Sequence, residues 1–222
     1  MYKSLKRILD IMVATIALII LLPVFMPCII LLLCTGEHEV FYLQQRIGYR
    51  LKPFSIYKFV TMMKGSLAMG TGDITIRNDP RVFPFGSILR KTKINELPQF
   101  LNVFLGSMGL VGPRPLTVNT FNYYPENVQR LIGKMKPGIT GVGSVIFRDE
   151  EKYISTVDDP RTFYKEFIAP YKGALEVWYV GHASFLLDIK LIIITAWVII
   201  SPKSNLPHKW LKDLPPKPKW MD

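Results

Sequence analysis

Ile11–Cys34 reads IMVATIALIILLPVFMPCIILLLC, an almost unbroken run of 24 apolar residues that decides the fold class. As a straight helix this run would be about 36 Å long, enough to cross a hydrocarbon core of about 30 Å. Lys3, Lys6 and Arg7 precede it and predict a cytoplasmic N-terminus. The run is too long for a secretory signal peptide, and no small-residue cleavage site follows it before Glu37.

Two topologies are open for this run. A single crossing would place residues 36–222 outside the cytoplasm, together with most of the basic residues of the chain. Pro23 and Pro27 each remove a backbone donor and clash with the preceding turn, so they predict a kink near the middle. A helix broken there could enter and leave the bilayer by the same face, because protein or water can satisfy the freed backbone groups.

The charge balance indicates a polyanionic partner. The chain carries 28 Lys and Arg against 17 Asp and Glu, a formal net charge of +11. Anionic lipid, a phosphorylated substrate and nucleic acid all fit this charge. A nucleic-acid site would need aromatic residues interleaved with the cations or a recognisable binding module, and the sequence has neither. We therefore expect membrane lipid and a phosphorylated substrate as partners, and no nucleic acid.

The remaining segments indicate a small domain of mixed secondary structure. Residues 39–41 and 54–60 are rich in apolar and aromatic side chains, as in strands. Residues 96–105 and 121–135 place apolar side chains at helical spacing. Leu191–Ile200 is apolar but too short to cross a bilayer, and it predicts an interfacial or core helix.

Together these segments predict an α+β protein. It has an N-terminal membrane-embedded helix and a small, mostly helical cytoplasmic domain with short strands and interfacial amphipathic helices. We expect the membrane helix at residues 1–36, the cytoplasmic domain at 37–184, and an interfacial helix with a basic tail at 185–222. Cys28 and Cys34 both lie in the apolar run, in a pattern that indicates neither a metal site nor a disulfide framework.

An ordered set of short motifs resembles one known family, the monotopic phosphoglycosyl transferases, which are bacterial sugar transferases of the polyprenyl-phosphate type. The resemblance covers about four-fifths of the chain, and its specificity comes from the order of the whole set. The matching segments are Lys6–Asp10, Leu22-Pro23, Gln44–Gly48, Tyr57–Met62, Asn78–Val82, Gly86–Thr92, Asn95–Val103, Leu110–Pro115, Lys136–Gly141 and Phe185–Lys190.

The resemblance implies an activity, a cofactor and a location. Family members transfer a phosphosugar from a UDP-sugar to polyprenyl (undecaprenyl) phosphate, release UMP and require Mg²⁺, which initiates assembly of a surface glycan. The family's first helix is broken at the position of Leu22-Pro23 into a re-entrant hairpin. We therefore expect an enzyme of the bacterial inner membrane with its catalytic domain on the cytoplasmic face. The sugar is not specified, and homo-oligomerisation is left open.

Cations that could hold the two phosphates of such a substrate lie in separate segments. Arginine binds phosphate in a bidentate manner, which lysine cannot do. Arg114 lies between Pro113 and Pro115, which restrict the backbone and so limit where its guanidinium points. A surface or structural arginine remains the alternative at several of these positions, and at Arg46. The candidate phosphate-binding residues are Arg114, Arg90, Arg81, Arg148 and Lys58.

Two carboxylates are candidate metal ligands. Glu96 opens a predicted helix and could ligate a metal or act as a general acid or base, although an acidic residue in a first helical turn is also favoured by the helix dipole. Asp79 precedes Pro80, so it could ligate a metal or simply start a turn.

Asn95 departs from the family at its most important position. The family uses an Asp-Glu pair in which the Asp attacks phosphorus and the Glu assists, and Asn95 stands where that Asp is expected, beside Glu96. An amide has no anionic oxygen with which to attack. Four explanations follow: Glu96 is the nucleophile, the lipid phosphate displaces UMP directly, the chain is an inactivated form, or it is a non-enzymatic membrane scaffold of the same family. We favour the enzyme, because the phosphate-type arginines persist.

Overall fold

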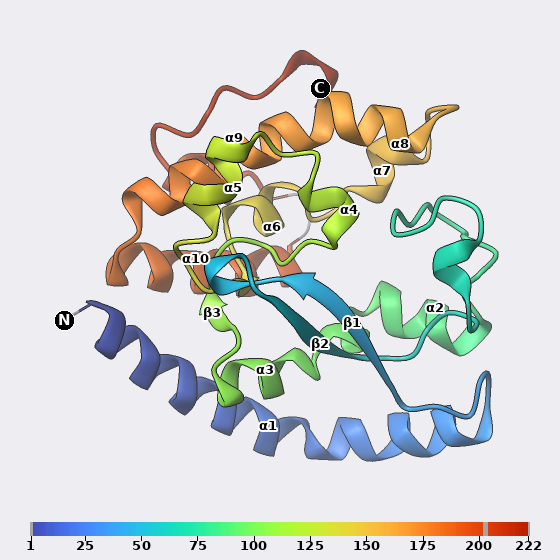
Figure 1. Ribbon diagram of the computed structural model, residues 1–222. Coiled ribbons are helices and arrows are strands. Elements are labelled where there is room, and N and C mark those ends of the chain that lie inside the picture. The colour runs from blue at the N-terminus through green and yellow to red at the C-terminus, as the bar shows by residue number, and fades with distance from the viewer. Residues whose placement is uncertain (1, 202–203, 222) are drawn as a thin grey trace.

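The computed structural model describes residues 2–201 and 204–221 and is rich in helices (Figure 1). The helices are α1 (Tyr2–Cys34), α2 (Pro84–Lys91), α3 (Gln99–Leu105), α4 (Val118–Phe121), α5 (Glu126–Ile132), α6 (Val142–Ile146), α7 (Glu151–Ile154), α8 (Pro160–Phe163), α9 (Ala169–His182), α10 (Phe185–Ile200) and α11 (Leu206–Trp210). The strands are β1 (Phe41–Ile47), β2 (Pro53–Phe59), β3 (Gly109–Val111) and β4 (Gly138–Thr140).

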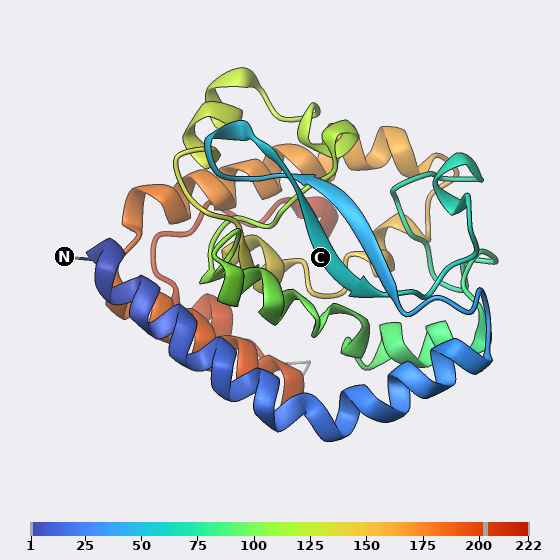
Figure 2. The same cartoon turned by 60° about the horizontal axis from the view of Figure 1, so that its bottom comes forward.

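Helix α1 is the one described helix that is long and apolar enough to cross a membrane. It contains both Pro23 and Pro27 and bends near its middle (Figure 2). Only 17% of its most apolar window is buried inside the protein, so most of its apolar side chains face outward. The exposed ones include Ile16, Ile19, Ile20, Leu22 and Met26. A helix this apolar and this exposed fits a membrane anchor.

Polar contacts fasten the first half of α1 to the domain. Asp188 of α10 is 1% exposed and accepts hydrogen bonds from Tyr2 (2.9 Å), Lys6 (2.6 Å) and Tyr179 (2.6 Å). One buried carboxylate therefore joins three helices, α1, α9 and α10. Because the charge of Asp188 is matched by Lys6 and by two hydroxyl donors, its burial is tolerated.

Two further residues of α1 satisfy backbone groups of other elements. Arg7 donates to the carbonyl oxygens of Val103 (2.6 Å) and Phe104 (2.8 Å) at the end of α3, where a helix leaves carbonyls unpaired. Asp10 accepts a hydrogen bond from the backbone N–H of Leu110 in β3, at 2.9 Å. The charged residues before the apolar run therefore bind this helix to the domain.

The second half of α1 packs against the same domain through apolar contacts. Phe25, Cys28 and Leu32 are buried in a cluster with Phe59 of β2 and Leu89 of α2. The rings of Phe25 and Phe59 meet edge to face, with centroids 5.3 Å apart. Both halves of the bent helix thus rest on one domain, on either side of the bend.

The sheets confirm part of the predicted strand pattern. β1 and β2 form an antiparallel hairpin in which Phe41 pairs with Phe59. β2 lies close to the strand expected at 54–60, whereas β1 shares only Phe41 with the strand expected at 39–41. β3 and β4 pair in parallel, with Val111 opposite Thr140. That pairing was missed, because three-residue strands in turn-like, glycine- and proline-rich sequence give no periodic signal.

Prolines also move the helix boundaries. The helix expected at 121–135 is shorter than predicted: α5 begins directly after Pro125 and runs from Glu126 to Ile132, whereas α4 already ends at Phe121. The helix expected at 96–105 begins as a 3-10 turn, Ile94–Glu96, and continues as α3 after Pro98. Glu96 therefore lies in a separate turn before α3.

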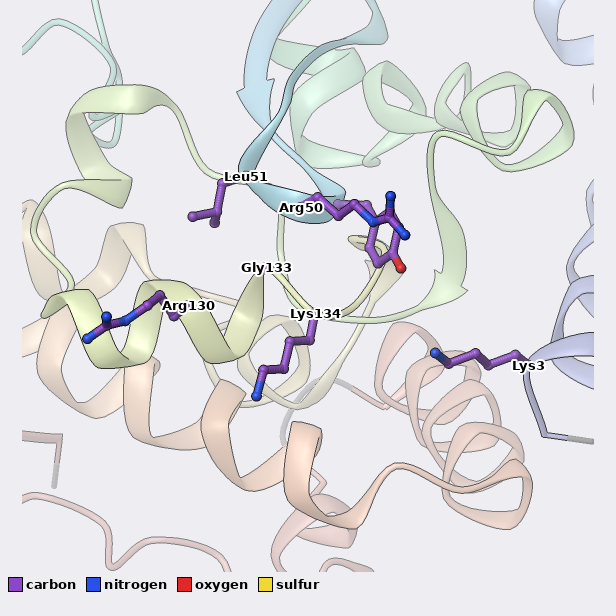
Figure 3. A pocket seen from close by; sticks show the side chains of 7 residues that line it. Lys3, Arg50, Leu51, Arg130, Gly133 and Lys134 are labelled. Carbon is purple, nitrogen blue, oxygen red and sulfur yellow. The ribbon is translucent and has the colours of Figure 1, made fainter.

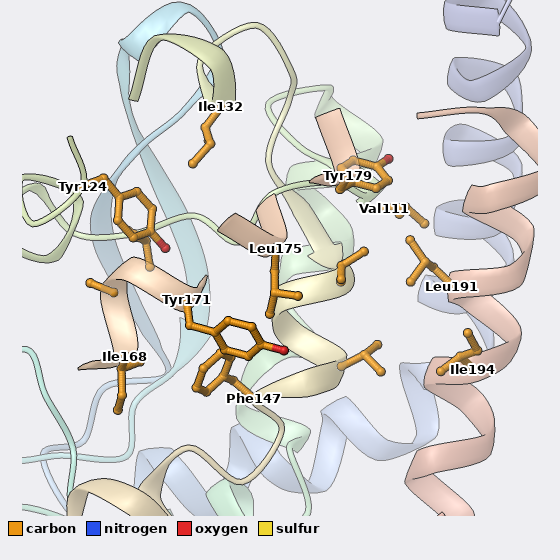
Figure 4. Packing of buried hydrophobic residues seen from close by; sticks show 14 of the residues in the cluster. Val111, Tyr124, Ile132, Phe147, Ile168, Tyr171, Leu175, Tyr179, Leu191 and Ile194 are labelled. Carbon is orange, nitrogen blue, oxygen red and sulfur yellow. The ribbon is translucent and has the colours of Figure 1, made fainter. Parts of the chain in front are cut away.

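Helix α10 contains the apolar run Leu191–Ile200 and lies beside the first half of α1 (Figure 2). Leu191 and Ile194 are buried, whereas Trp197 and Ile200 are exposed. The buried face packs against α9 and α6 in the main core, where side chains from several helices point toward one another (Figure 4). The helix is thus half core and half exposed apolar surface.

We predict that Asp188→Ala destabilises the protein by roughly 3–5 kcal/mol, because it leaves the Lys6 ammonium without its buried partner. In detergent this should lower the midpoint of thermal unfolding, followed by circular dichroism, by on the order of 10 °C. Asp158→Ala, at an exposed site, is the matched control and should change the midpoint little. Equal midpoints for the two variants would contradict a central role for Asp188.

Candidate active site

Three basic residues from separate segments gather around one carboxylate, Glu96. Oε1 of Glu96 lies 3.4 Å from Nζ of Lys58 on β2 and 3.4 Å from Nη2 of Arg114 in the loop after β3. Arg46 of β1 lies close enough for its charge to interact with those of Arg114 and Glu96. Lys58 and Arg114, selected from the sequence, are thus brought to Glu96, which completes a mixed cluster with excess positive charge.

The cations hold Glu96 in its ionised form. Burial acts to raise the pKa of Glu96, but the positive charges of Lys58, Arg114 and Lys93 outweigh it and hold this pKa well below its usual value. Burial and the neighbouring arginines lower the pKa of Lys58 from 10.5 to about 7, against the attraction of Glu96. The cluster therefore contains a permanent carboxylate and a lysine that titrates near neutrality.

Arg46 is a site residue that sequence reasoning left undecided. Its guanidinium donates to Oε1 of Gln44 (3.2 Å from Nε) and to the carbonyl oxygen of Pro115 (3.3 Å). Burial, and then the charge of Arg114, lower its pKa from 12.5 to about 10. Gln44 and Arg46 share one face of β1, and this two-residue spacing is the signal that could have placed them together.

The loop that carries Arg114 is fixed by its backbone. Gly112 passes so close to the chain at Lys136 that an added Cβ would lie 2.4 Å from the Lys136 carbonyl oxygen. The carbonyl of Pro113 accepts from the N–H of Gly138 at 3.0 Å, and the N–H of Arg114 donates to Oε1 of Glu176 at 3.2 Å. These contacts, in a loop that two prolines flank, set the position of Arg114.

Asp79 and Arg81 lie in a different environment. Asp79 is 6% and Arg81 4% exposed, and they form an ion pair at 2.6 Å. All three guanidinium nitrogens of Arg81 are engaged, by Asp79, Thr71 and the carbonyl oxygens of Ser66, Met69, Gly72 and Ile74. The pair holds the loop before it together, and no contact joins either residue to Glu96 within the described chain. This geometry leaves Arg81 without a free donor for phosphate.

The other two candidate arginines have different surroundings. Arg90 pairs with Glu151 at 3.5 Å, and its charge helps to lower the pKa of Lys58. Nη1 of Arg148 is buried without a hydrogen-bond partner among the described residues. Buried donors ordinarily have a hydrogen-bond acceptor, so Arg148 is an exception among the described residues.

The residues around Glu96 fit a magnesium ion in one specific way. In the described part of the chain, no group of three or more His, Cys, Asp or Glu side chains is placed to hold a metal ion. Mg²⁺ commonly takes only one or two protein oxygens and completes its octahedron with water and substrate phosphates. The Glu96 carboxylate and Oδ1 of the adjacent Asn95, which is buried without a hydrogen-bond partner among the described residues, are the two oxygen donors present here.

Glu176 is a buried carboxylate that supports the Arg114 loop. It is 2% exposed, and its second oxygen, Oε2, has no hydrogen-bond partner among the described residues. Burial raises its pKa from 4.5 to about 7, although the hydrogen bond from Arg114 and the charge of Lys172 act in the opposite direction. Lys172 is itself paired with Glu150, which limits how far it can stabilise an ionised Glu176.

This raised pKa makes stability depend on pH. Between about pH 4.5 and pH 7 the native state keeps a proton on Glu176 that the unfolded chain has lost, so stability falls as the pH rises through this window. At about 1.4 kcal/mol per pKa unit, the loss is roughly 3 kcal/mol above pH 7.

We predict that Glu176→Gln, which keeps the acceptor for Arg114 but cannot ionise, unfolds at a higher temperature than the wild type at about pH 8 and at a similar temperature at about pH 5. Thermal unfolding at the two pH values measures the difference. Glu166→Gln, at an exposed site, is the control. The same offset at both pH values would show that ionisation of Glu176 is not its cause.

The sequence profile of one family, described as bacterial sugar transferase, matches residues 1–202. Among characterised relatives, the chain is 33% identical to the UDP-glucose:undecaprenyl-phosphate glucose-1-phosphate transferase of Escherichia coli, over 88% of this chain and 40% of that protein. It is 31% identical to the undecaprenyl-phosphate galactose phosphotransferase of Salmonella typhimurium, over 89% of this chain and 41% of that protein.

A shorter relative matches along most of its length. The exopolysaccharide production protein ExoY of Sinorhizobium fredii is 30% identical, over 86% of this chain and 83% of that protein. The chain thus spans about two-fifths of the two longer relatives and most of the shorter one. With the family profile matched from α1 through α10, the chain belongs to the bacterial sugar transferase family.

Proposed function

We propose that this chain transfers a phosphosugar from a UDP-sugar to undecaprenyl phosphate, releases UMP and so initiates assembly of a surface glycan. The convergence of Arg46, Lys58 and Arg114 on Glu96 carries the proposal. The names of the Escherichia coli and Salmonella typhimurium relatives describe the same class of reaction. A non-enzymatic scaffold would not need these half-buried like charges, which cost free energy to bring together.

The cations suit the charge of a diphosphate. Phosphoryl transfer is catalysed mainly by positioning and by neutralising charge on the phosphate oxygens. Arg114 offers a fixed guanidinium for bidentate contact, and Arg46 and Lys58 add charge from the hairpin. When a diphosphate binds these cations, it competes with Glu96 for them. The carboxylate is then less tightly paired and can react.

Glu96 is the nucleophile in the mechanism that we propose, because Asn95 has no anionic oxygen. Both close cations contact Oε1 of Glu96, and no hydrogen bond or ion pair joins Oε2 to the described residues. Oε2 attacks the sugar-bearing phosphorus, the bond to the bridging oxygen breaks, and its electron pair leaves with UMP. An oxygen of undecaprenyl phosphate then attacks the same phosphorus and restores the carboxylate, with no net proton transfer.

Mg²⁺ belongs to this proposal as the cofactor. When bound, it would supply additional positive charge to the diphosphate oxygens. Glu96 and Asn95 are the residues that would hold it, and Asn95 would then have a role in binding in place of attack.

We further propose that α1 is re-entrant, with its break near Leu22-Pro23, and that the domain lies on the cytoplasmic face of the inner membrane. Its first half is bound to the domain by Lys6, Arg7 and Asp10, and its second half packs on Phe59 and Leu89. A helix that crossed the bilayer would carry one of its ends away from the domain. Contacts at both ends favour a helix that returns to the face it entered.

We predict that incubation with a UDP-sugar, without lipid acceptor, adds one phosphosugar mass to the wild-type chain, located on Glu96 by peptide mass spectrometry. Glu96→Gln should carry no added mass, because an amide cannot attack. Asn95→Asp should remain able to form an adduct.

Two outcomes distinguish an error in the role of Glu96 from an error in the transferase activity. UMP release that occurs only with undecaprenyl phosphate, with no adduct at any stage, would mean direct displacement and not attack by Glu96. No UMP from a broad panel of UDP-sugars, with Mg²⁺ and acceptor present, would contradict the transferase itself.

We predict that Arg114→Lys lowers kcat/KM for UMP release by on the order of 10- to 100-fold, because a single ammonium replaces a charge-assisted bidentate contact worth about 1.5–3 kcal/mol. Arg77→Lys is the matched control, since Arg77 is half-exposed and pairs with Asp149 outside the cluster. Equal effects of the two substitutions would contradict a specific role for Arg114.

A further inference from the structure

A second basic site lies at the far end of the β1–β2 hairpin from Lys58. It is a hollow of about 510 Å³ between the start of α1, the hairpin turn and the end of α5. Four of its seven lining residues are cations, Lys3, Arg50, Arg130 and Lys134, and none is acidic (Figure 3). We call this site the basic hollow. It shares no residue with the cluster around Glu96.

The cations of the basic hollow have no acidic partners. No ion pair joins Lys3, Arg50, Arg130 or Lys134 to another described residue. Tyr49 stands among them, and its pKa is lowered by Arg50 and, more weakly, by Lys3 and Lys136. Cations near the end of α5 are favoured by its helix dipole, which accounts for Arg130 but not for Lys3 or Arg50.

The hairpin turn that carries Arg50 is held in an unusual backbone conformation. Arg50 and Leu51 both have left-handed φ, 58° and 60°, which residues other than glycine and asparagine rarely adopt. The N–H of Arg50 donates to the carbonyl of Gly133 at 2.8 Å. Leu51 packs so closely on Gly133 that an added Cβ there would lie 2.6 Å from the leucine side chain. The strained turn is therefore fixed on α5, with Arg50 beside the hollow.

The position of Lys3 points to the ligand. Lys3 lies in the first turn of α1, immediately before the part of this helix that presents apolar side chains outward. If α1 lies in the bilayer, its first turn lies at the level of the headgroups. A hollow that opens beside that turn, lined by cations and a hydroxyl, matches a phosphate diester with polar substituents.

We propose that the basic hollow binds the headgroup of an anionic phospholipid and so holds the N-terminal side of the domain on the membrane. The proposal rests on the placement of α1 in the bilayer and not on the transfer reaction. Retention of lipid by the purified protein tests it without any measurement of activity.

The full chain is reconstituted in phosphatidylcholine with and without phosphatidylglycerol, extracted in mild detergent and weighed by native mass spectrometry. We expect the wild type to retain phosphatidylglycerol in preference to phosphatidylcholine. Arg130→Gln with Lys134→Gln should lower this preference roughly 30-fold, from two contributions of about 1 kcal/mol each. Both residues are exposed, so the folded state should be kept.

Lys165→Gln with Lys212→Gln is the matched control, because it removes the same charge from two exposed sites outside the hollow. This pair should leave the lipid preference unchanged. An equal loss in both double variants would mean that net charge alone attracts the lipid, and would overturn the proposal. So would a wild type that shows no preference, or one whose bound phosphatidylglycerol is displaced by an equal concentration of inorganic phosphate.

Discussion

The balance between one carboxylate and the cations around it is the constraint on which the rest of the site depends. Arg46, Lys58 and Arg114 repel one another, and burial adds to the cost of their charges. Glu96 offsets part of that cost, since it lies 3.4 Å from two of them. The remaining positive charge lowers the pKa of Lys58 to about 7. The cluster thus keeps an excess of positive charge, which would stabilise a ligand with more negative charge than Glu96 carries.

The scaffold explains how these charges are kept together. The hairpin β1–β2 supplies Arg46 and Lys58, and Arg46 is tied to Pro115, next to Arg114. Behind the loop, Glu176 of α9 accepts a hydrogen bond from the backbone of Arg114. The loop and the hairpin are therefore positioned by the same core that binds α1 through Asp188. In this arrangement α1 and the site share one support.

Several parts of the site could be predicted from the sequence and others could not. Arg114 between two prolines and Glu96 at the start of a predicted helix have local signals, and both lie in the cluster. Arg81 has the same chemistry as Arg114, but its donors are used by Asp79 and by nearby carbonyls. Arg46 was left undecided, because Pro115, Arg114 and Glu96, which place it in the site, are distant in the sequence. Motif and residue type identify what could bind phosphate, whereas the availability of donors depends on long-range contacts.

The sequence by itself determined the apolar α1 and the family, because an apolar run and ordered motifs are local properties of the chain. It also showed that Asn95 replaces the Asp of the family's Asp-Glu pair, so that Glu96 is the one carboxylate left in that pair. Only the tertiary structure decided that Lys58, Arg46 and Arg114 meet at Glu96, that Asp79 and Arg81 serve a loop, and that Arg50 faces a second basic hollow. These outcomes depend on charges and backbone groups from segments far apart in the chain, whose pairing is fixed only when the core packs.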